Sequence, residues 1–245
     1  MVRSDVQSFL LAKEFLRTLD NNLYRFIVGK RVIPPTDEVK RLTIEEYSKN
    51  FSINILIETG TYLGETIDAL KNKFVKLISI ELDTVLFEKA RAKFGDFSHI
   101  SILHGNSSQI LQLYLASIHE PALFWLDGHY SGTGTAKGEF NTPILGELKA
   151  ILNHPIKSHV ILIDDARCFV GENGYPTMKD LFSFINKINR NLRFVIEDDI
   201  IRILPRDKFN HSNLSTYKES WRQVAGRCYR RLRQPVRQLF LMKKN

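Results

Sequence analysis

The residues best suited to chemistry lie in a short segment, 55–66, where a hydrophobic run leads into a turn that contains Gly60 and Gly64. Glycine lets the backbone turn tightly, so a ligand can approach the main chain and meet free N–H groups at the start of the next helix. Glu81 ends the following hydrophobic run, about twenty residues after the turn, a spacing that suits a carboxylate binding ribose hydroxyls. A nucleoside-type cofactor is therefore favoured, and a tight strand–helix turn without a ligand is the alternative.

The residues around these glycines argue against a dinucleotide. A dinucleotide-binding turn has the pattern Gly-x-Gly-x-x-Gly, in which the second glycine makes room for a pyrophosphate. Tyr62 stands at the place of that second glycine and would obstruct a pyrophosphate. Glu58, two residues before Gly60, would suit a cationic ligand such as the ammonium group of an amino acid. An NAD-dependent sugar enzyme is therefore disfavoured, although it stays open as an alternative.

Strand-like and helix-like segments alternate from residue 53 onward. Strands are expected near 53–58, 76–81, 99–103, 122–127 and 159–164, and helices near 65–73, 84–94, 107–117, 143–153 and 177–189. This alternation predicts an α/β fold, a Rossmann-like doubly wound sheet that is mostly parallel and has helices on both faces. Two last runs, 192–197 and 200–204, are joined so briefly that they must form an antiparallel hairpin, which completes a seven-stranded sheet.

Polar residues gather where the predicted strands end. In an open parallel sheet, ligands bind beyond the carboxyl ends of the strands. Those ends hold Glu58, Glu81, the run Gly105-Asn106-Ser107, the run Asp127-Gly128-His129, and the pair Asp164-Asp165. The sequence therefore predicts a polar ligand site along one edge of the sheet.

The pattern Glu58-x-Gly60-x-x-x-Gly64 resembles motif I of the class I S-adenosylmethionine-dependent methyltransferases. The resemblance spans about residues 53–205 and implies a methyltransferase fold with S-adenosylmethionine as the cofactor. It implies that the methionine part lies against the first turn, the ribose against Glu81, and the adenine near Asn106 and Ser107. At that place the family commonly has Gly-Asp-Ala/Ser, whereas this chain has Gly105-Asn106-Ser107. The residues that it assigns to the cofactor site are Glu58, Gly60, Thr61, Tyr62, Gly64, Thr66, Glu81, Asn106, Ser107 and Asp127.

The last two strand ends resemble a narrower group, the metal-dependent O-methyltransferases of the catechol and macrocin types. This resemblance implies that Asp127, Asp164 and Asp165 bind a divalent cation, for which their oxygen ligands favour Mg²⁺. The metal would hold an acceptor hydroxyl and lower its pKa. Two alternatives stay open: the aspartates cap turns and have a structural role only, or they act electrostatically without a metal.

A general base is expected beside Asp127. The catechol enzyme has a lysine three residues after this aspartate, and this chain has Tyr130 there, so His129 is the candidate base, with a structural histidine as the alternative. The glycine-rich segment 130–142 is long for a strand–helix connection and is expected to act as a lid over the acceptor, with a merely disordered loop as the alternative. Arg167 and Tyr175 are further candidates for contact with the acceptor.

The net charge of +8 is concentrated near the C-terminus. Residues 206–245 hold 11 Lys/Arg and two acidic residues, whereas the preceding 205 residues have a net charge of −1. The tail has apolar and arginine residues at helical spacing, which favours a basic amphipathic helix on an anionic membrane surface. A solvated or homodimer-packing tail is the main alternative, and nucleic acid is disfavoured because the tail lacks stacking aromatics.

Three domains follow from these patterns. Residues 1–50, with helices expected over 4–19 and 37–50, form an N-terminal helical extension or lid; residues 51–206 form the methyltransferase domain; and residues 207–245 form the basic tail. Without an apolar run long enough for a membrane span or a convincing signal peptide, the chain is expected in the cytoplasm, with peripheral membrane contact left open.

The predicted function is methyl transfer from S-adenosylmethionine to a hydroxyl oxygen of a sugar or small hydroxylated metabolite, assisted by a divalent metal. Asp127 and His129 are the predicted catalytic residues. The alternatives are a Rossmann-like binding or regulatory protein that has lost catalysis, and the NAD-dependent sugar enzyme.

Overall fold

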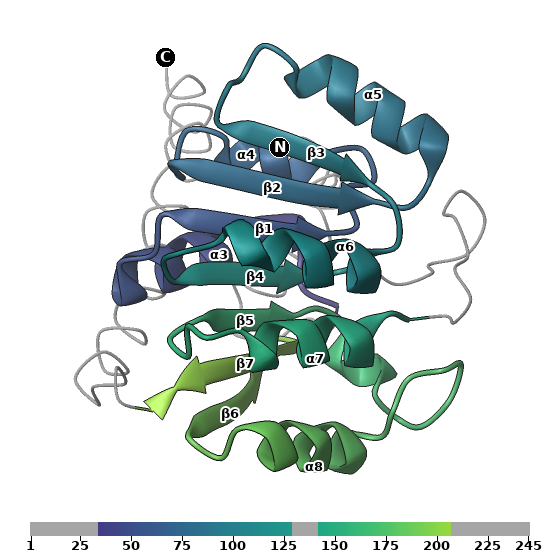
Figure 1. The fold of residues 1–245 in the computed structure, drawn as a ribbon. Coiled ribbons are helices and arrows are strands. Elements are labelled where there is room, and N and C mark those ends of the chain that lie inside the picture. The colour runs from purple at the N-terminus through teal and green to yellow at the C-terminus, as the bar shows by residue number, and fades with distance from the viewer. Residues whose placement is uncertain (1–33, 129–141, 207–245) are drawn as a thin grey trace, which may run out of the picture. The chain divides into compact units, whose positions relative to one another are not determined.

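The computed structural model describes residues 34–128 and 142–206 of the chain (Figure 1). The predicted helix over 4–19, the candidate base His129, nearly all of the predicted lid 130–142 and the basic tail lie outside the described residues. In the part of the chain that is described, no helix combines the length and the apolar character needed to cross a membrane.

One sheet forms the centre of the unit Asp37–Lys208, and its strand order is β3-β2-β1-β4-β5-β7-β6 (Figure 1). The first five strands in sequence pair in parallel, and β7 pairs antiparallel with both β5 and β6. The prediction of a mostly parallel seven-stranded sheet with a closing antiparallel hairpin is therefore confirmed for the described residues. The strands are β1 (Ile55–Thr59), β2 (Lys76–Glu81), β3 (Ile100–His104), β4 (Ala122–Leu126), β5 (Val160–Ile163), β6 (Leu192–Glu197) and β7 (Ile200–Pro205).

Helices cover both faces of this sheet. In Figure 1, α3 and α4 lie behind the strands and α6 and α7 lie in front, while α5 packs beside β2 and β3, and α8 packs beside α7. The α-helices are α3 (Asp37–Phe51), α4 (Glu65–Leu70), α5 (Thr84–Phe94), α6 (Ser107–Tyr114), α7 (Ile144–Asn153) and α8 (Met178–Ile188), with 3₁₀ turns η1 (Leu115–Ser117) and η2 (Ala166–Cys168). Helix α4 is shorter than the predicted 65–73, because the chain leaves the helix at Leu70 and turns toward β2.

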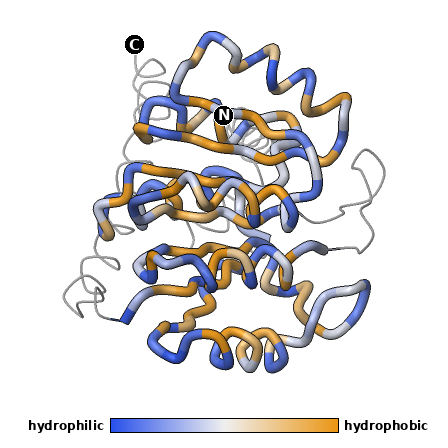
Figure 2. Tube along the Cα trace, viewed as in Figure 1, coloured by the Kyte–Doolittle hydropathy of each residue, from blue (hydrophilic) through white to orange (hydrophobic). Residues whose placement is uncertain are grey.

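The strands are hydrophobic because helices bury them from both sides. Every residue of β1, β4 and β5 is buried, and Figure 2 shows hydrophobic residues concentrated along the strands and hydrophilic residues in the connections. Polar side chains begin the helices: Asp83 caps α5, Asn106 caps α6 and Thr177 caps α8, each accepting hydrogen bonds from backbone N–H groups of the first turn.

The strand order reverses between β1 and β4, because the chain proceeds outward from β1 through β2 to β3 and then returns to β4 on the other side. Such a reversal leaves a crevice at the carboxyl ends of the two strands, where open α/β sheets bind their ligands. The backbone just beyond the strands is still joined there, because Asp127 N–H donates to the carbonyl of Thr59 and Asp164 N–H donates to that of Leu126. The residues after β1, β4 and β5 are therefore held side by side.

Helix α3 packs against α4, β4 and β5. Ile44 is fully buried in this interface, and Val39 and Tyr47 are nearly so, one helical turn before and after it. The three domain boundaries predicted from the sequence stay predictions. The packing of α3 matters for function because it places one lysine of the helix beside the ends of β4 and β5.

Candidate functional site

The turn between β1 and α4 has a backbone conformation that only glycine adopts easily. Gly60 has φ of +83° and Gly64 has φ of +70°, and Tyr62 between them also has a positive φ, +48°. A Cβ at position 60 would lie 2.5 Å from the backbone oxygen of Asp127. The turn therefore lies directly against the end of β4, which places the two predicted halves of the site in contact.

Glu81 fixes this turn from the end of β2. One of its carboxylate oxygens accepts a hydrogen bond from Tyr62 N–H at 2.8 Å, and the other accepts one from Asp83 N–H, also at 2.8 Å. A carboxylate offers about four lone-pair directions, so about two remain for hydroxyl groups of a ligand. The predicted ribose-binding acid therefore lies beside the glycine turn, as the cofactor prediction requires.

Glu58 lies beneath the turn, with 2% of the residue exposed. Ser79, its partner across β1 and β2, donates to Oε2 at 2.6 Å, Thr66 also hydrogen-bonds the carboxyl, and Thr61 pairs with the Ser79 hydroxyl at 2.7 Å. Burial raises the pKa of Glu58 to about 8, and the hydroxyl hydrogen bonds only partly oppose this rise. Three residues predicted to touch the cofactor (Glu58, Thr61 and Thr66) thus form one buried network under the turn.

Thr59, the last residue of β1, is fully buried, and its hydroxyl Oγ1 has no hydrogen-bond partner among the residues that the structure describes. This hydroxyl lies near Gly128, because a Cβ placed there would be 3.1 Å from it. An unpaired buried hydroxyl destabilises a folded protein by roughly 1–3 kcal/mol. The end of β1 therefore keeps a polar atom that residues 34–128 and 142–206 do not use.

The side chains at the surface of the turn are large and apolar. Tyr62 is 53% exposed and Leu63 is 51% exposed, an unusual pair to leave in contact with water. An aromatic ring beside the Glu81 carboxylate suits a planar heterocyclic base or an apolar part of a second substrate. Tyr62, which argued against a pyrophosphate in the sequence, is thus placed to contact a ligand on the outside of the turn.

Asn106 and Ser107 begin α6 after β3. The side-chain oxygen of Asn106 accepts from Ser108 N–H at 3.0 Å and from Ser108 Oγ at 2.7 Å, so it serves as the helix cap. The Asn106 amide nitrogen is the atom left to donate to a base, and Ser107 is buried in the first turn. Gly105 N–H donates to the Glu81 carbonyl, so this segment is tied to the end of β2.

The aspartates after β4 and β5 surround a lysine that sequence reasoning missed. Lys40 of α3 reaches Asp164, whose side chain is fully buried, with 2.5 Å between Nζ and Oδ2. Burial alone would lower the pKa of Lys40, but Asp164, Asp127 and Asp165 together raise it above its usual value. No local pattern in the sequence links residue 40 to the strand ends, because only the packing of α3 brings it there.

Asp165 faces a second cation. Its backbone is left-handed, with φ of +56°, and its Oδ1 accepts from Arg167 Nη1 at 2.6 Å. The same Arg167 group pairs closely with Asp199 in the β6–β7 turn, and Arg167 N–H donates to Asp199 Oδ1 at 2.8 Å. Arg167, predicted as an acceptor contact, is therefore partly committed to joining the loop after β5 to the hairpin.

The three aspartates do not fit a divalent cation as they are arranged. Asp164 uses Oδ2 for Lys40 and Oδ1 for Asp165 N–H, while Asp165 turns toward Arg167. In the described ranges, 34–128 and 142–206, no group of three or more His, Cys, Asp or Glu side chains could hold a metal ion. The cations that pair with Asp164 and Asp165 are instead the side chains of Lys40 and Arg167.

A second carboxylate missed from the sequence is Glu147, which is 1% exposed in the first turn of α7. It lines a small enclosed cavity of about 10 Å³, close to the size of one water molecule, together with Gly128, Asp164 and Tyr175. Burial raises the pKa of the Tyr175 hydroxyl above its ordinary value, so this phenol stays protonated and can donate. Only the helical periodicity of α7 could have indicated that Glu147 points inward.

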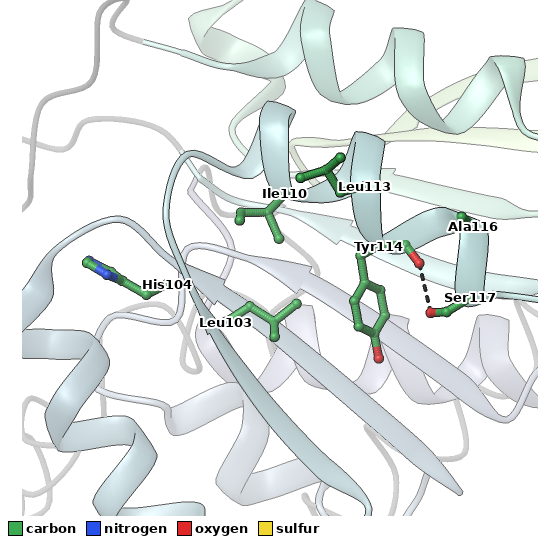
Figure 3. A pocket seen from close by; sticks show the side chains of 7 residues that line it. All are labelled: Leu103, His104, Ile110, Leu113, Tyr114, Ala116 and Ser117. Atoms are coloured by element: carbon green, nitrogen blue, oxygen red, sulfur yellow. Dashed lines mark hydrogen bonds between the residues drawn. The ribbon is translucent and has the colours of Figure 1, made fainter.

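A larger open groove of about 620 Å³ lies at the other end of α6 and along the edge strand β3. Figure 3 shows Leu103, Ile110 and Tyr114 facing a common space, with His104 apart from them at the end of β3. His104 stacks on Phe87 with 4.8 Å between ring centroids and lies 3.2 Å from the Leu82 carbonyl. None of the residues predicted to bind cofactor or metal lines this groove, so the candidate site is the polar crevice and not this apolar surface.

The sequence matches no protein-family model and no protein of curated function. The structure is similar to an O-methyltransferase from Bacillus cereus in complex with SAH: 11% identity, 77% of this chain and 90% of that chain covered, TM-score 0.52. It is also similar to the O-methyltransferase TomG from Streptomyces achromogenes in complex with SAM (13% identity, 70% and 82% covered, TM-score 0.48). A third neighbour is the SAH-bound methyltransferase PaMTH1 from Podospora anserina (13% identity, 75% and 86% covered, TM-score 0.46).

The strand order and the likeness to the Bacillus cereus structure show the fold of class I S-adenosylmethionine-dependent methyltransferases. The fold resemblance stated from the sequence is therefore confirmed. The roles of individual residues stay predictions, with the geometry described above.

Proposed function

We propose that this chain transfers a methyl group from S-adenosylmethionine to a hydroxyl oxygen of a small acceptor such as a sugar. The observation that carries the proposal is the Glu81 carboxylate, which ends β2, holds the Gly60–Gly64 turn and keeps lone pairs for a ribose. The Bacillus cereus protein with this fold is an O-methyltransferase with bound SAH, which supports the choice of cofactor and of oxygen as the acceptor atom.

In the proposed reaction, a lone pair of the acceptor oxygen forms a bond to the methyl carbon as the bond from that carbon to sulfur breaks. The products are a methyl ether and neutral S-adenosylhomocysteine, and the hydroxyl proton passes to a base. Asp127, beside the turn, and His129, outside the described residues, are the candidate bases. The chain's main contribution is to hold both reactants in line and to place fixed charges beside them.

Calorimetry with the full chain tests the cofactor. We expect binding of S-adenosylmethionine and S-adenosylhomocysteine and no comparable binding of NAD, because Tyr62 occupies the place where a pyrophosphate needs glycine. Binding of NAD alone would overturn the proposal. Binding of both sulfur compounds without release of S-adenosylhomocysteine across a panel of sugars, catechols and other small alcohols would favour the non-catalytic binding protein instead.

The variant Glu81→Gln tests whether Glu81 is part of the cofactor site. Loss of a charged acceptor should weaken S-adenosylmethionine binding by about 10–100-fold, the range expected for hydrogen bonds to a charged group. Glu88→Gln is the matched control, since Glu88 lies on the outer surface of α5 and pairs with Arg91 there. Equal affinities of the two variants would remove Glu81 from the cofactor site.

A further inference from the structure

The acidic cluster formed by Asp127, Asp164 and Asp165 is an electrostatic problem that the chain has to solve. Carboxylates that converge in a partly buried crevice repel one another, and a cation or a proton must offset them. Asp164 has no exposed side-chain surface, so water cannot screen its charge. Burial raises the pKa of Asp164 and so favours its protonation, whereas the charge of Lys40 opposes that rise and favours the carboxylate.

Lys40 supplies that charge from α3. Its Nζ lies 2.5 Å from Asp164 Oδ2, only 20% of its side chain is exposed, and the charges of Asp127 and Asp165 act on it as well. The position is fixed by packing and not by a flexible surface contact, because α3 is held to β4 and β5 by the buried residues Val39, Ile44 and Tyr47. An ammonium group offers three donors, so Lys40 can hold Asp164 and still face a second group.

A divalent metal could not join this arrangement without displacing the lysine. Mg²⁺ binds oxygen at about 2.0–2.1 Å, so it would have to share Asp164 Oδ2 with an ammonium group at hydrogen-bond distance, against strong repulsion. Asp164 Oδ1 is used by Asp165 N–H, and Asp165 Oδ1 is used by Arg167. The oxygens that the sequence assigned to a metal are thus directed at protein donors.

We propose that Lys40 is the resident cation of the acceptor site, in the place that a divalent metal would take, so that the chain works without a metal. The part of this inference that concerns methyl transfer rests on the proposed function; the part that concerns metal binding does not. In the reaction, the ammonium charge lies beside the acceptor oxygen as negative charge develops there, and it keeps Asp164 in position. Lys40 is therefore a positioning residue with an electrostatic role.

Manganese binding tests the metal part directly. Mn²⁺ is titrated into the full chain and its free concentration is followed by electron paramagnetic resonance, and only binding that disappears with Asp164→Asn is counted. We expect none for the wild-type chain at micromolar Mn²⁺. Lys40→Ala removes the cation and leaves space, so it should gain an Asp164-dependent site that is measurable at micromolar Mn²⁺, and Lys40→Ala/Asp164→Asn should lose it.

Two further variants separate charge from shape. Lys40→Met removes the charge but fills the space, so it should gain no metal site, and Lys49→Ala removes an exposed lysine of the same helix and should behave as the wild type. A merely structural role for Lys40 predicts lower stability but no gain of metal binding. Asp164-dependent Mn²⁺ binding by the wild type, or no gain in Lys40→Ala, would overturn the proposal.

If Lys40→Ala does not fold, judged by circular dichroism, the wild-type titration decides: Asp164-dependent binding refutes the proposal and its absence supports it. S-adenosylmethionine affinity is measured on the same samples. A chain that binds neither S-adenosylmethionine nor Mn²⁺ would refute the proposed function while leaving Lys40 as the cation of the cluster. Where turnover is found, EDTA should leave it unchanged, and loss of turnover that Mg²⁺ restores would refute metal independence.

Discussion

The two ends of the sheet bury polar side chains in different ways. At the carboxyl end, Glu58 is buried with a pKa of about 8, Thr59 Oγ1 has no partner among the described residues, and the backbone at the non-glycine residue Tyr62 is left-handed. Each of these features lowers the stability of the folded chain. They are gathered within a few residues, at the place where the strand order reverses.

At the amino end, two buried histidines form a chain of hydrogen bonds that satisfies both. Ala122 N–H donates to His159 Nδ1 at 3.0 Å, so His159 carries its proton on Nε2 and donates to His154 Nδ1 at 2.9 Å. His154 Nε2 then donates to the Leu115 carbonyl at 3.0 Å. All four ring nitrogens have partners, and the two rings join the starts of β4 and β5 to η1.

The difference shows how buried polar groups of one fold divide between stability and function. A closed set of hydrogen bonds, as at His154 and His159, stabilises one structure and offers nothing to a ligand. A buried hydroxyl without a partner in the described chain and a buried carboxyl with a raised pKa, as at Thr59 and Glu58, are costly without a ligand and are typical of binding sites. The comparison predicts opposite responses to pH and to the removal of polar atoms at the two ends.

The largest expected effect is at Glu58. Its pKa is 4.5 in the unfolded chain and about 8 when folded, so the folded state holds an extra proton between these values and stability falls as pH rises through them. The free energy of unfolding can fall by at most about 5 kcal/mol, because each pKa unit of difference corresponds to about 1.4 kcal/mol. Glu58→Gln mimics the protonated form, so urea unfolding from pH 5 to 9 should show the variant gaining on the wild type as pH rises.

The difference between the two stability curves isolates Glu58. Burial also raises the pKa of Glu46, to about 7, but Glu46 is present in both proteins and its contribution cancels. Glu88→Gln on the outer surface of α5 controls for the change in net charge and should track the wild type. Parallel curves for Glu58→Gln and the wild type would mean that Glu58 is ionised when folded, and the comparison between the two ends would fail.

A smaller effect of the opposite sign is expected at His159. Burial, with a contribution from His154, lowers its pKa from 6.5 to about 4, so the unfolded chain binds more protons between these values and stability falls as pH drops through them. The contribution lost by pH 4 is about 3 kcal/mol. Urea unfolding between pH 4 and 7 measures this loss of stability at acid pH. The loss should be smaller in His159→Gln and unchanged in His119→Gln, whose site is exposed. If His159→Gln loses as much stability at acid pH as the wild type, a group other than His159 causes the loss.

The sequence was sufficient for the fold because its signals are local. The predicted helix 84–94 coincides with α5, and the hairpin follows from two residues between β6 and β7, Asp198 and Asp199, which both have positive φ in the structure. The glycine turn and Glu81 could be paired from spacing alone, since adjacent parallel strands end at the same edge. Chain-local patterns of this kind do not depend on how distant elements pack.

The chemistry at the ends of β4 and β5 could be predicted only in part, because it depends on long-range packing. The aspartates were found from their places after the strands, but the cation beside them comes from Lys40, more than a hundred residues before Asp164. Glu147 was missed because an acidic residue is usually exposed, and only its place on the apolar face of α7 indicates that it is buried. Ser79 was missed because its role appears only when Glu58 faces it across the strand pair.

The smallest expected effect comes from two buried threonines. Thr59→Val removes a hydroxyl that has no partner, so the free energy of unfolding should rise by about 1 kcal/mol. Thr43→Val is the matched control, because Thr43 Oγ1 donates to the Val39 carbonyl at 2.8 Å and its loss should lower the free energy of unfolding by about 1 kcal/mol. If the Thr59 hydroxyl is retained for a ligand, Thr59→Val should also bind S-adenosylmethionine more weakly, as calorimetry would show. A variant that is less stable than the wild type would show that Thr59 is part of a closed set like that of the histidines.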